Sequence, residues 1–163
     1  MATYKSGYKR SNNDRFLTFA IVGFGAVILA LALGLIIYNI VNVQYKYSDF
    51  ENINSFYAIQ TQEEDEYLVY YYSESCGYCN EIKEDVLNFA HENNAGIKMY
   101  LLDAATATGS TLVITDPTSG ATMDGTPSLI IVKNGVIVQM SPGYINVIQI
   151  IEEINSGTNN YIN

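Results

Sequence analysis

Hydrophobic side chains are distributed very unevenly along this chain. From Phe16 to Val41 there are 26 residues without a single Asp, Glu, Lys, Arg or His. A helix of that length, rising about 1.5 Å per residue, reaches roughly 39 Å, which exceeds the hydrocarbon core of a bilayer at about 30 Å. The pattern predicts a transmembrane helix within a membrane segment 16–43. It leaves a basic cytoplasmic N-terminus at 1–15 and one folded extracytoplasmic domain at 44–163.

Charge differs in sign on the two sides of the membrane segment. Four of the eight Lys and Arg residues precede it, whereas sixteen of the seventeen Asp and Glu residues follow it. Because Lys-rich and Arg-rich ends stay in the cytoplasm, we expect a single-pass protein of the cell membrane with its N-terminus inside and its acidic domain outside. A domain of that charge is not expected to bind nucleic acid.

Two further features bear on the membrane segment. Ala30-Leu31-Ala32 has the small-x-small form of a signal-peptide cleavage site, so cleavage is the alternative to an anchor. The apolar run continues beyond that site, and cleavage there would leave a hydrophobic new N-terminus. Tyr38, Tyr45 and Tyr47 fall where an aromatic belt is expected at the outer membrane surface.

The first half of the domain alternates between helical and strand periods. We expect a short helix over 49–59, where apolar residues recur at helical spacing. Residues 67–72 form a continuous β-branched and aromatic run, which is typical of a strand buried on both faces. Residues 76–93 carry one apolar helical stripe, and 97–102 read as a second strand. A right-handed crossover makes the two strands parallel.

The second half ends in a hairpin and a helix. The stretch 103–125 is rich in small and polar residues, and we expect either a short helix or a hairpin about 116–120 within it. Strands at 128–132 and 136–140 flank an Asn-Gly pair, the strongest short hairpin signal. Residues 144–154 repeat apolar side chains at helical spacing. The order predicts an α/β fold with a four-stranded mixed sheet flanked by helices.

The two cysteines, Cys76 and Cys79, stand between the first strand and the helix that follows it. At a helix N-terminus, unpaired N–H groups and the helix dipole favour an anion, so we expect Cys76 to be a nucleophilic thiolate. Cys79 lies one turn further on, where it can reach the Cys76 sulfur. The spacing therefore predicts a nucleophile and a resolving cysteine.

Three other interpretations of this pair are weaker. A zinc site needs about four ligands, and His91 is the one histidine, so we expect no metal. A structural disulfide that closes so short a loop constrains the unfolded chain very little. Two unrelated thiols are not expected at a helix start outside the cell, where oxidants reach them.

The segment from Tyr67 to Cys79, followed by Gly125-Thr126-Pro127-Ser128, resembles the thioredoxin superfamily. The resemblance covers roughly 49–154 and implies the thioredoxin-like fold. It also implies that the bond before Pro127 is cis and lies against the disulfide, and that the backbone of Thr126 pairs with bound substrate as an added strand.

The dipeptide Gly77-Tyr78 and the Thr126 before the proline are similar to bacterial extracytoplasmic disulfide isomerases and their relatives. The whole chain looks like a membrane-anchored thioredoxin-like protein of a Gram-positive bacterium. The resemblance therefore implies that Gly77, Tyr78, Thr126 and Pro127 contact substrate.

Two positions near the cysteines depart from the family pattern. Thioredoxin has a buried Asp six residues before the first cysteine, which helps to deprotonate the resolving cysteine, and here that position is Tyr70. A phenol with an ordinary pKa near 10 is a poor base at neutral pH. Ser75 replaces the usual Trp. Glu74 is the nearest other candidate, so Tyr70 and Glu74 are the residues considered for proton transfer.

These features predict a thiol-disulfide oxidoreductase that acts on extracytoplasmic proteins or peptides through Cys76 and Cys79. No metal or organic cofactor is expected, and a membrane redox partner would supply or remove electrons. The Gly77-Tyr78 dipeptide favours reduction or isomerisation over oxidation. The alternative is a thioredoxin-like accessory or binding module, for example in secretion or peptide export, with little turnover.

Overall fold

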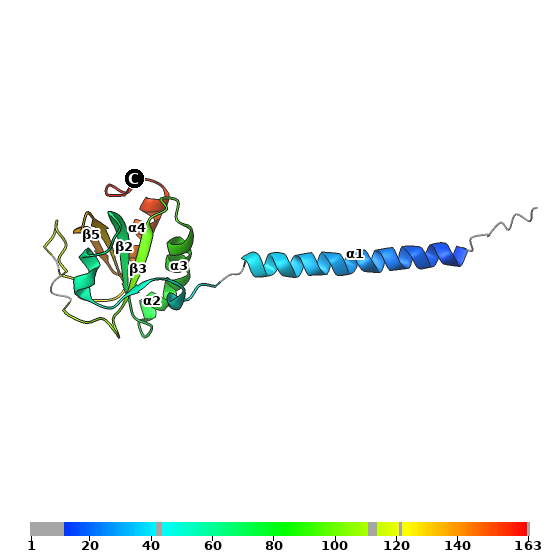
Figure 1. Cartoon of the computed structure of the whole chain (residues 1–163), viewed down its shortest axis with the longest axis horizontal. Helices are drawn as coiled ribbons and strands as arrows, with labels where there is room; N and C mark the ends of the chain where they lie inside the picture. Colours follow the sequence, from blue (N-terminus) through cyan, green and yellow to red (C-terminus); the bar gives the residue numbers. More distant parts are fainter. Residues whose placement is uncertain (1–11, 42–43, 111–113, 121, 163) are drawn as a thin grey trace, which may run out of the picture. The chain divides into compact units, whose positions relative to one another are not determined.

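The computed structural model describes residues 12–41, 44–110, 114–120 and 122–162, and the chain forms two compact units, 1–43 and 44–163 (Figure 1). The first unit contains one helix, α1 (Asn12–Val41). Its Phe16–Tyr38 stretch is 23 residues long, has a mean hydropathy of 2.8 and is nowhere buried by protein, so by length and composition it can cross a membrane. Most of the predicted N-terminal segment lies outside the described residues.

The second unit is built on a five-stranded mixed sheet in the order β1-β3-β2-β4-β5. Its strands are β1 (Asn52–Ile53), β2 (Glu66–Tyr72), β3 (Lys98–Asp103), β4 (Ser128–Lys133) and β5 (Val136–Pro142). β1, β3 and β2 are mutually parallel. β4 runs antiparallel to β2, and β5 runs antiparallel to β4. The four predicted strands are confirmed, but the predicted strand count was one too low, because the two-residue β1 adds to the free edge of β3.

The segment before β2 is not the single helix predicted over 49–59. It holds two 3-10 turns, η1 (Tyr47–Asp49) and η2 (Phe56–Gln60), with β1 between them. Phe50 packs against one core of the domain, whereas Ile53 belongs to the other. The apolar spacing therefore serves two faces of the sheet, which one helical stripe could not reach.

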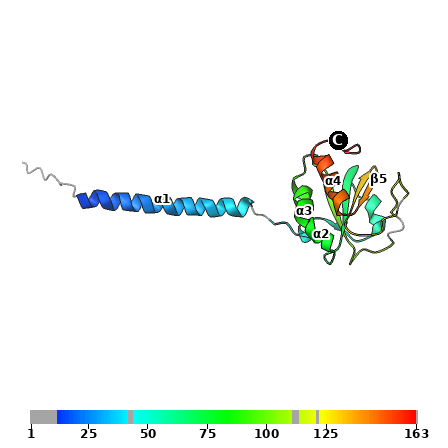
Figure 2. The same ribbon diagram turned by 180° about the vertical axis from the view of Figure 1, so that it is seen from behind.

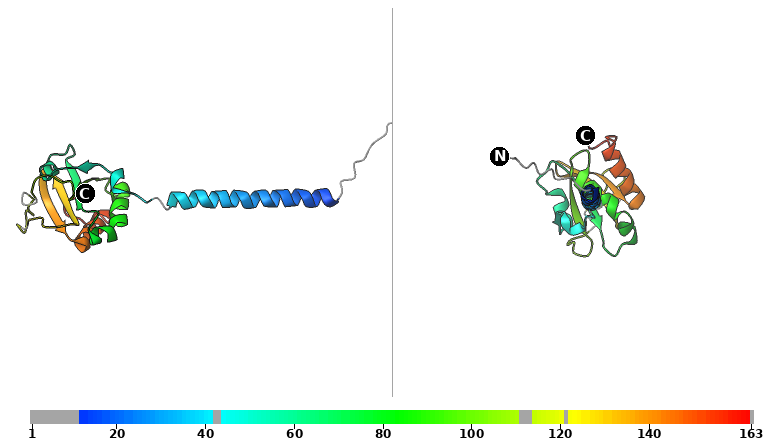
Figure 3. Two further views of the ribbon diagram at one scale, coloured as in Figure 1. Left: turned by 90° about the horizontal axis from the view of Figure 1, so that it is seen from below. Right: turned by 90° about the vertical axis from the view of Figure 1, so that its right-hand side faces the viewer.

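The helix predicted over 76–93 is broken into α2 (Gly77–Glu81) and α3 (Lys83–Glu92), which meet at Ile82. The last helix is α4 (Tyr144–Asn155), as expected. α3 and α4 lie side by side on one face of the sheet (Figures 1, 2 and 3). The opposite face is covered by η2 and by the irregular chain after β3.

Side chains of β2 alternate between two cores, as the pleat of a strand requires. Leu68, Tyr70 and Tyr72 share a core with α2, α3 and α4. Tyr67, Val69 and Tyr71 belong to the core on the other face. The prediction that this strand is buried on both faces is confirmed, and it places the residues that follow Tyr72 at the end of the central strand.

The irregular stretch after β3 contains the predicted hairpin about 116–120. Thr115 and Thr122 form an isolated antiparallel bridge, and the N–H of Gly120 donates to the carbonyl of Asp116 at 2.9 Å. Residues 111–113 and 121 of this stretch lie outside the described residues. The Asn-Gly turn between β4 and β5 is also confirmed, with positive φ at Asn134 and Gly135.

Candidate active site

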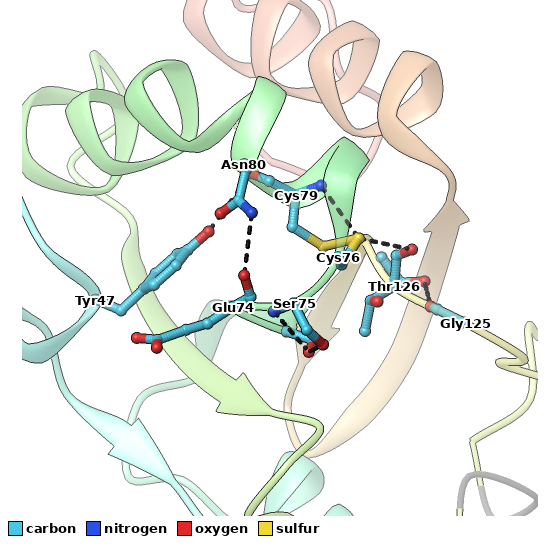
Figure 4. The surroundings of a disulfide bond; sticks show 10 residues. Tyr47, Glu74, Ser75, Cys76, Cys79, Asn80, Gly125 and Thr126 are labelled. Carbon is cyan, nitrogen blue, oxygen red and sulfur yellow. Dashed lines mark hydrogen bonds between the residues drawn. A yellow bond between two sulfur atoms is a disulfide. The ribbon is translucent and has the colours of Figure 1, made fainter.

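Cys76 and Cys79 form a disulfide at the start of α2 (Figure 4). Their Cα atoms are 5.2 Å apart, and the backbone N–H of Cys79 donates to Sγ of Cys76 at 3.2 Å. Cys79 is fully buried, whereas Cys76 is partly exposed. α2 has only five residues, so local N–H groups, more than a long helix dipole, are what can stabilise a Cys76 thiolate.

Thr126 lies beside this disulfide, although it follows Cys76 by 50 residues. Sγ of Cys76 is 3.4 Å from the carbonyl oxygen of Thr126. The Thr126-Pro127 peptide bond is cis, which confirms the geometry that the family resemblance implied. Ser128 Oγ donates to the carbonyl of Gly125 at 2.7 Å and closes this turn. Pairing of the Thr126 backbone with substrate stays a prediction.

The two residues between the cysteines are exposed. Gly77 has no neighbouring atom within 4 Å of the position that a Cβ would take. The Tyr78 side chain is 58% exposed, and its ring stacks on that of Tyr144 at 4.8 Å, with the planes 3° apart. Sequence reasoning placed Tyr144 on the apolar stripe of the last helix and did not connect it with the site.

Tyr70 lies in the same core as Cys79 and is fully buried. Its hydroxyl has no hydrogen-bond partner among the described residues. Burial raises the pKa of Tyr70 far above that of an ordinary phenol, and the neighbouring Tyr47 adds to this shift. The phenol therefore stays protonated at neutral pH, when it can donate a hydrogen bond but cannot act as a base.

Glu74 is exposed, and its carboxylate points away from the two sulfur atoms (Figure 4). Its backbone carbonyl accepts a hydrogen bond from the side chain of Asn80 at 3.0 Å. Burial raises the pKa of Tyr72 to about 12, and the Glu74 charge adds to this effect. The structure does not bring the carboxylate to either cysteine, and proton transfer by Glu74 stays a prediction.

Tyr47 is a second residue of this region that sequence reasoning did not connect with the site. It is 3% exposed, stacks on Tyr72 at 3.9 Å and directs its hydroxyl at the carbonyl oxygen of Cys79, 3.5 Å away. Lys83 Nζ lies 4.5 Å from the centre of its ring. Burial raises the pKa of Tyr47 to about 12.

The assignment of Tyr47 to a membrane belt was therefore wrong, because its ring is buried in the domain, whereas that of the partly exposed Tyr45 stays a prediction. Tyr45 also packs within the domain, with its ring 4.4 Å from that of His91. Both rings find aromatic partners in the folded domain, far along the sequence. No local pattern distinguishes such a tyrosine from one at a membrane surface, since Tyr47 and Cys79 are 32 positions apart.

No group of three or more His, Cys, Asp or Glu side chains in the described part of the chain is arranged to hold a metal ion. The one histidine, His91, is exposed and lies 3.8 Å from the Glu92 carboxylate. The chemistry offered by the site is that of the cysteine pair.

The sequence model of the thioredoxin family matches residues 49–156. Plasmodium falciparum thioredoxin is 16% identical, with 63% of this chain and 97% of that chain covered and a TM-score of 0.48. Saccharomyces cerevisiae mitochondrial thioredoxin 3 is 13% identical, covering 68% and 97%, with a TM-score of 0.49. Malassezia sympodialis thioredoxin is 18% identical, covering 65% and 90%, with a TM-score of 0.45. No curated protein sequence matches the chain. Because the family match spans most of it, the chain belongs to the thioredoxin family.

Proposed function

We propose that this protein is a membrane-anchored thiol-disulfide oxidoreductase that exchanges disulfides with polypeptides outside the cytoplasm. The disulfide between a partly exposed Cys76 and a buried Cys79 carries this proposal. A partner can reach the exposed sulfur, whereas the buried sulfur can react only with its neighbour. This division of access suits one cysteine to attack and the other to resolve.

In the reducing direction, the Cys76 thiolate attacks one sulfur of a partner disulfide, and the second partner sulfur leaves as a thiolate. Cys79 then loses its proton and attacks Sγ of Cys76, which releases the first partner sulfur. Two electrons pass to the partner, and its two thiolates take up two protons in place of those lost by the cysteines. The same steps in reverse oxidise a partner dithiol. Neither direction needs a metal or an organic cofactor.

The surroundings of Cys79 bear on its proton. Tyr70 stays protonated at neutral pH, and the Glu74 carboxylate points away from the sulfurs. We therefore propose that water or the departing partner thiolate accepts the proton when Cys79 is deprotonated. Resolution then accelerates with pH through the pKa of Cys79, without a plateau set by an internal carboxylate.

The substrate contacts follow the family pattern. An extended substrate segment would pair with the backbone of Thr126, beside Pro127, and would meet the exposed Gly77 and Tyr78. Reduction or isomerisation is the favoured direction. Either direction requires a membrane redox partner that restores the starting state of the cysteine pair.

The apolar α1 supports a single membrane crossing, and the basic residues before it support a cytoplasmic N-terminus. A membrane-impermeant thiol reagent tests this orientation on intact cells after mild reduction. It should label Cys76 in the wild-type chain and leave a Cys76→Ser, Cys79→Ser chain unlabelled. Labelling only after the membrane is opened would reverse the assigned orientation.

The central experiment is a titration of the full chain, in non-ionic detergent, against glutathione and dithiothreitol. A reduction potential of about −270 mV would identify a reductase, and a potential above about −180 mV would identify an isomerase or oxidase. Cys76→Ser should abolish exchange, and Cys79→Ser should accumulate mixed disulfides with partners. Absence of a reversible two-electron couple, with a cellular role that survives Cys76→Ser, would instead identify an accessory binding module.

A further inference from the structure

An apolar groove opens between α2 and α4, next to the redox pair. Its volume is about 490 Å³. Its lining residues are Glu81, Ile82, Tyr144, Ile145, Ile148, Gln149 and Glu152. Ile82 is 5% exposed and Ile145 is 64% exposed, so the groove has a buried floor and an accessible apolar wall. Tyr144 stacks on Tyr78, which makes the groove continuous with the surface between the two cysteines.

The carboxylates that line this groove have no cationic partner. Glu81 and Glu152 are exposed, and among the described residues neither forms an ion pair. Two more exposed acidic residues, Glu74 and Asp124, each lie two positions before a residue of the site, namely Cys76 and Thr126. Exposed carboxylates therefore line the groove and flank the site residues in the sequence.

Lysine side chains neutralise acidic residues at the opposite end of the sheet. Lys98 pairs with Glu64 at 2.7 Å, and Lys133 pairs with Glu66. In the sheet register, Lys133 lies opposite Glu66 and Lys98 lies beside Tyr67, so both lysines are at the start of β2. The disulfide comes after the other end of this strand. Lys83, two residues after Glu81, lies over the Tyr47 ring and forms no ion pair among the described residues. Glu81 and Glu152 are therefore left without an ion-pair partner of their own and can pair with cationic groups of a bound polypeptide.

We infer that the groove between α2 and α4 receives an apolar side chain of a basic substrate polypeptide whose cysteine reacts with Cys76. Basic residues of that substrate pair with Glu81 and Glu152, while the apolar side chain packs against Ile145 and Ile82. This inference rests on the proposed function and names its substrate class. An acidic polypeptide would meet like charges at the same surface and react more slowly.

The test uses the pre-reduced full chain in non-ionic detergent and a matched set of fluorogenic disulfide peptides. The peptides carry Lys or Glu, and Leu or Ser, within a few residues of the cysteine. At low salt the Lys-Leu peptide should be reduced at least about tenfold faster than the Glu-Leu peptide, since steering by charge changes association rates by about 10 to 10³. At about 1 M salt, where the screening length is about 3 Å, this preference should largely disappear.

Two variants separate charge from apolar contact. The double variant Glu81→Gln, Glu152→Gln should lose most of the preference for Lys, and Glu63→Gln with Asp65→Asn, exposed at the other end of the sheet, should keep it. Ile145→Ser should slow the Leu peptides roughly tenfold, the effect expected for losing burial of one aliphatic side chain, and should spare the Ser peptides. Val136→Ser, an exposed apolar residue on the β4-β5 hairpin, is the matched control.

The outcomes separate the two levels of the argument. Equal rates for all four peptides, or equal effects of groove and control variants, would overturn the inference while leaving the oxidoreductase in place. A chain that reduces none of the peptides, and no small uncharged disulfide either, would overturn the proposed function and this inference together. Selective loss in the groove variants alone supports it.

Discussion

The two faces of the central sheet bury tyrosines in opposite ways. On the face away from the helices, the Tyr67 hydroxyl donates to the carbonyl of Ile59 at 2.7 Å. On the helical face, in the core that also holds Cys79, the Tyr70 hydroxyl forms no hydrogen bond of good geometry and interacts only with the hydroxyl of Tyr47. The Tyr47 hydroxyl reaches the Cys79 carbonyl only at 3.5 Å. Tyr67 is well paired, whereas the hydroxyls of Tyr70 and Tyr47 are poorly paired.

This difference shows where stability and function separate. A buried hydroxyl without a partner costs about 1–3 kcal/mol, so it is not explained by folding alone. The poorly paired hydroxyls occur in the layer that also holds Cys79, which changes between disulfide and thiol during exchange. Tyr67, in the layer remote from the cysteines, forms the short bond expected of a structural residue.

The largest expected contrast is in alkaline solution. Tyr47 and Tyr72, on the helical face, have pKa values raised to about 12 by burial, and that of Tyr70 is raised further. A raised pKa means that the folded chain holds the proton more tightly, so this stability is complete below pH 10 and is lost as pH rises through the folded pKa. Between pH 10 and its folded pKa, each such group lowers the free energy of unfolding by up to about 1.4 kcal/mol per pH unit.

Urea unfolding of the oxidised full chain at a series of pH values, with tyrosinate absorbance as a second signal, measures this loss. Tyr70→Phe should flatten the decline more than Tyr67→Phe does, because the shift at Tyr70 is the larger one. The same slope of unfolding free energy against pH in both variants would mean that the tyrosines on the two faces titrate alike.

Much of the sheet could be predicted from local pattern. β2 carries a continuous aromatic and β-branched run, and the β4-β5 turn requires the positive φ that Asn134 and Gly135 adopt. The cysteine pair could be placed because its spacing and its position after a central strand are both local. These elements depend on residues that are close together in the sequence.

Long-range packing accounts for what the sequence did not reveal. Tyr47 is held by Tyr72 and Cys79, which are distant in the chain, and β1 exists only because the edge of β3 offers unpaired backbone groups. Neither proline nor glycine marks the break at Ile82, whose side chain packs into the core as the backbone turns. The spacing of apolar residues does not specify which face each will occupy.

A smaller effect of opposite sign should follow at neutral pH. Tyr67→Phe removes the bond to the Ile59 carbonyl and leaves that buried oxygen without its donor, which should cost about 1–3 kcal/mol. Tyr70→Phe removes a hydroxyl that forms no hydrogen bond of good geometry and interacts only with the hydroxyl of Tyr47, so it should be neutral or stabilise by about 1 kcal/mol. Urea midpoints of both variants measure the difference. An equal loss in both would show that Tyr70 is as well paired as Tyr67.

The smallest effect concerns Tyr47→Phe, which keeps the ring on Tyr72 and beneath Lys83 but removes the hydroxyl that points at the Cys79 carbonyl. At 3.5 Å this bond contributes less than about 1 kcal/mol. The positive end of its dipole faces Cys79 and favours the thiolate, so its loss should make the reduction potential more negative by no more than about 20 mV, given that 30 mV corresponds to about 1.4 kcal/mol.

Tyr72→Phe is the matched control, because Tyr72 belongs to the same ring stack and its hydroxyl donates to the side chain of Asn52, away from Cys79, at 3.4 Å. It should lower the urea midpoint as much as Tyr47→Phe does, and it should leave the potential of the cysteine pair in place. Equal shifts of potential in the two variants would mean that Tyr47 affects the redox centre through the ring stack and a general loosening of the helical face. The hydroxyl directed at Cys79 would then have no specific effect.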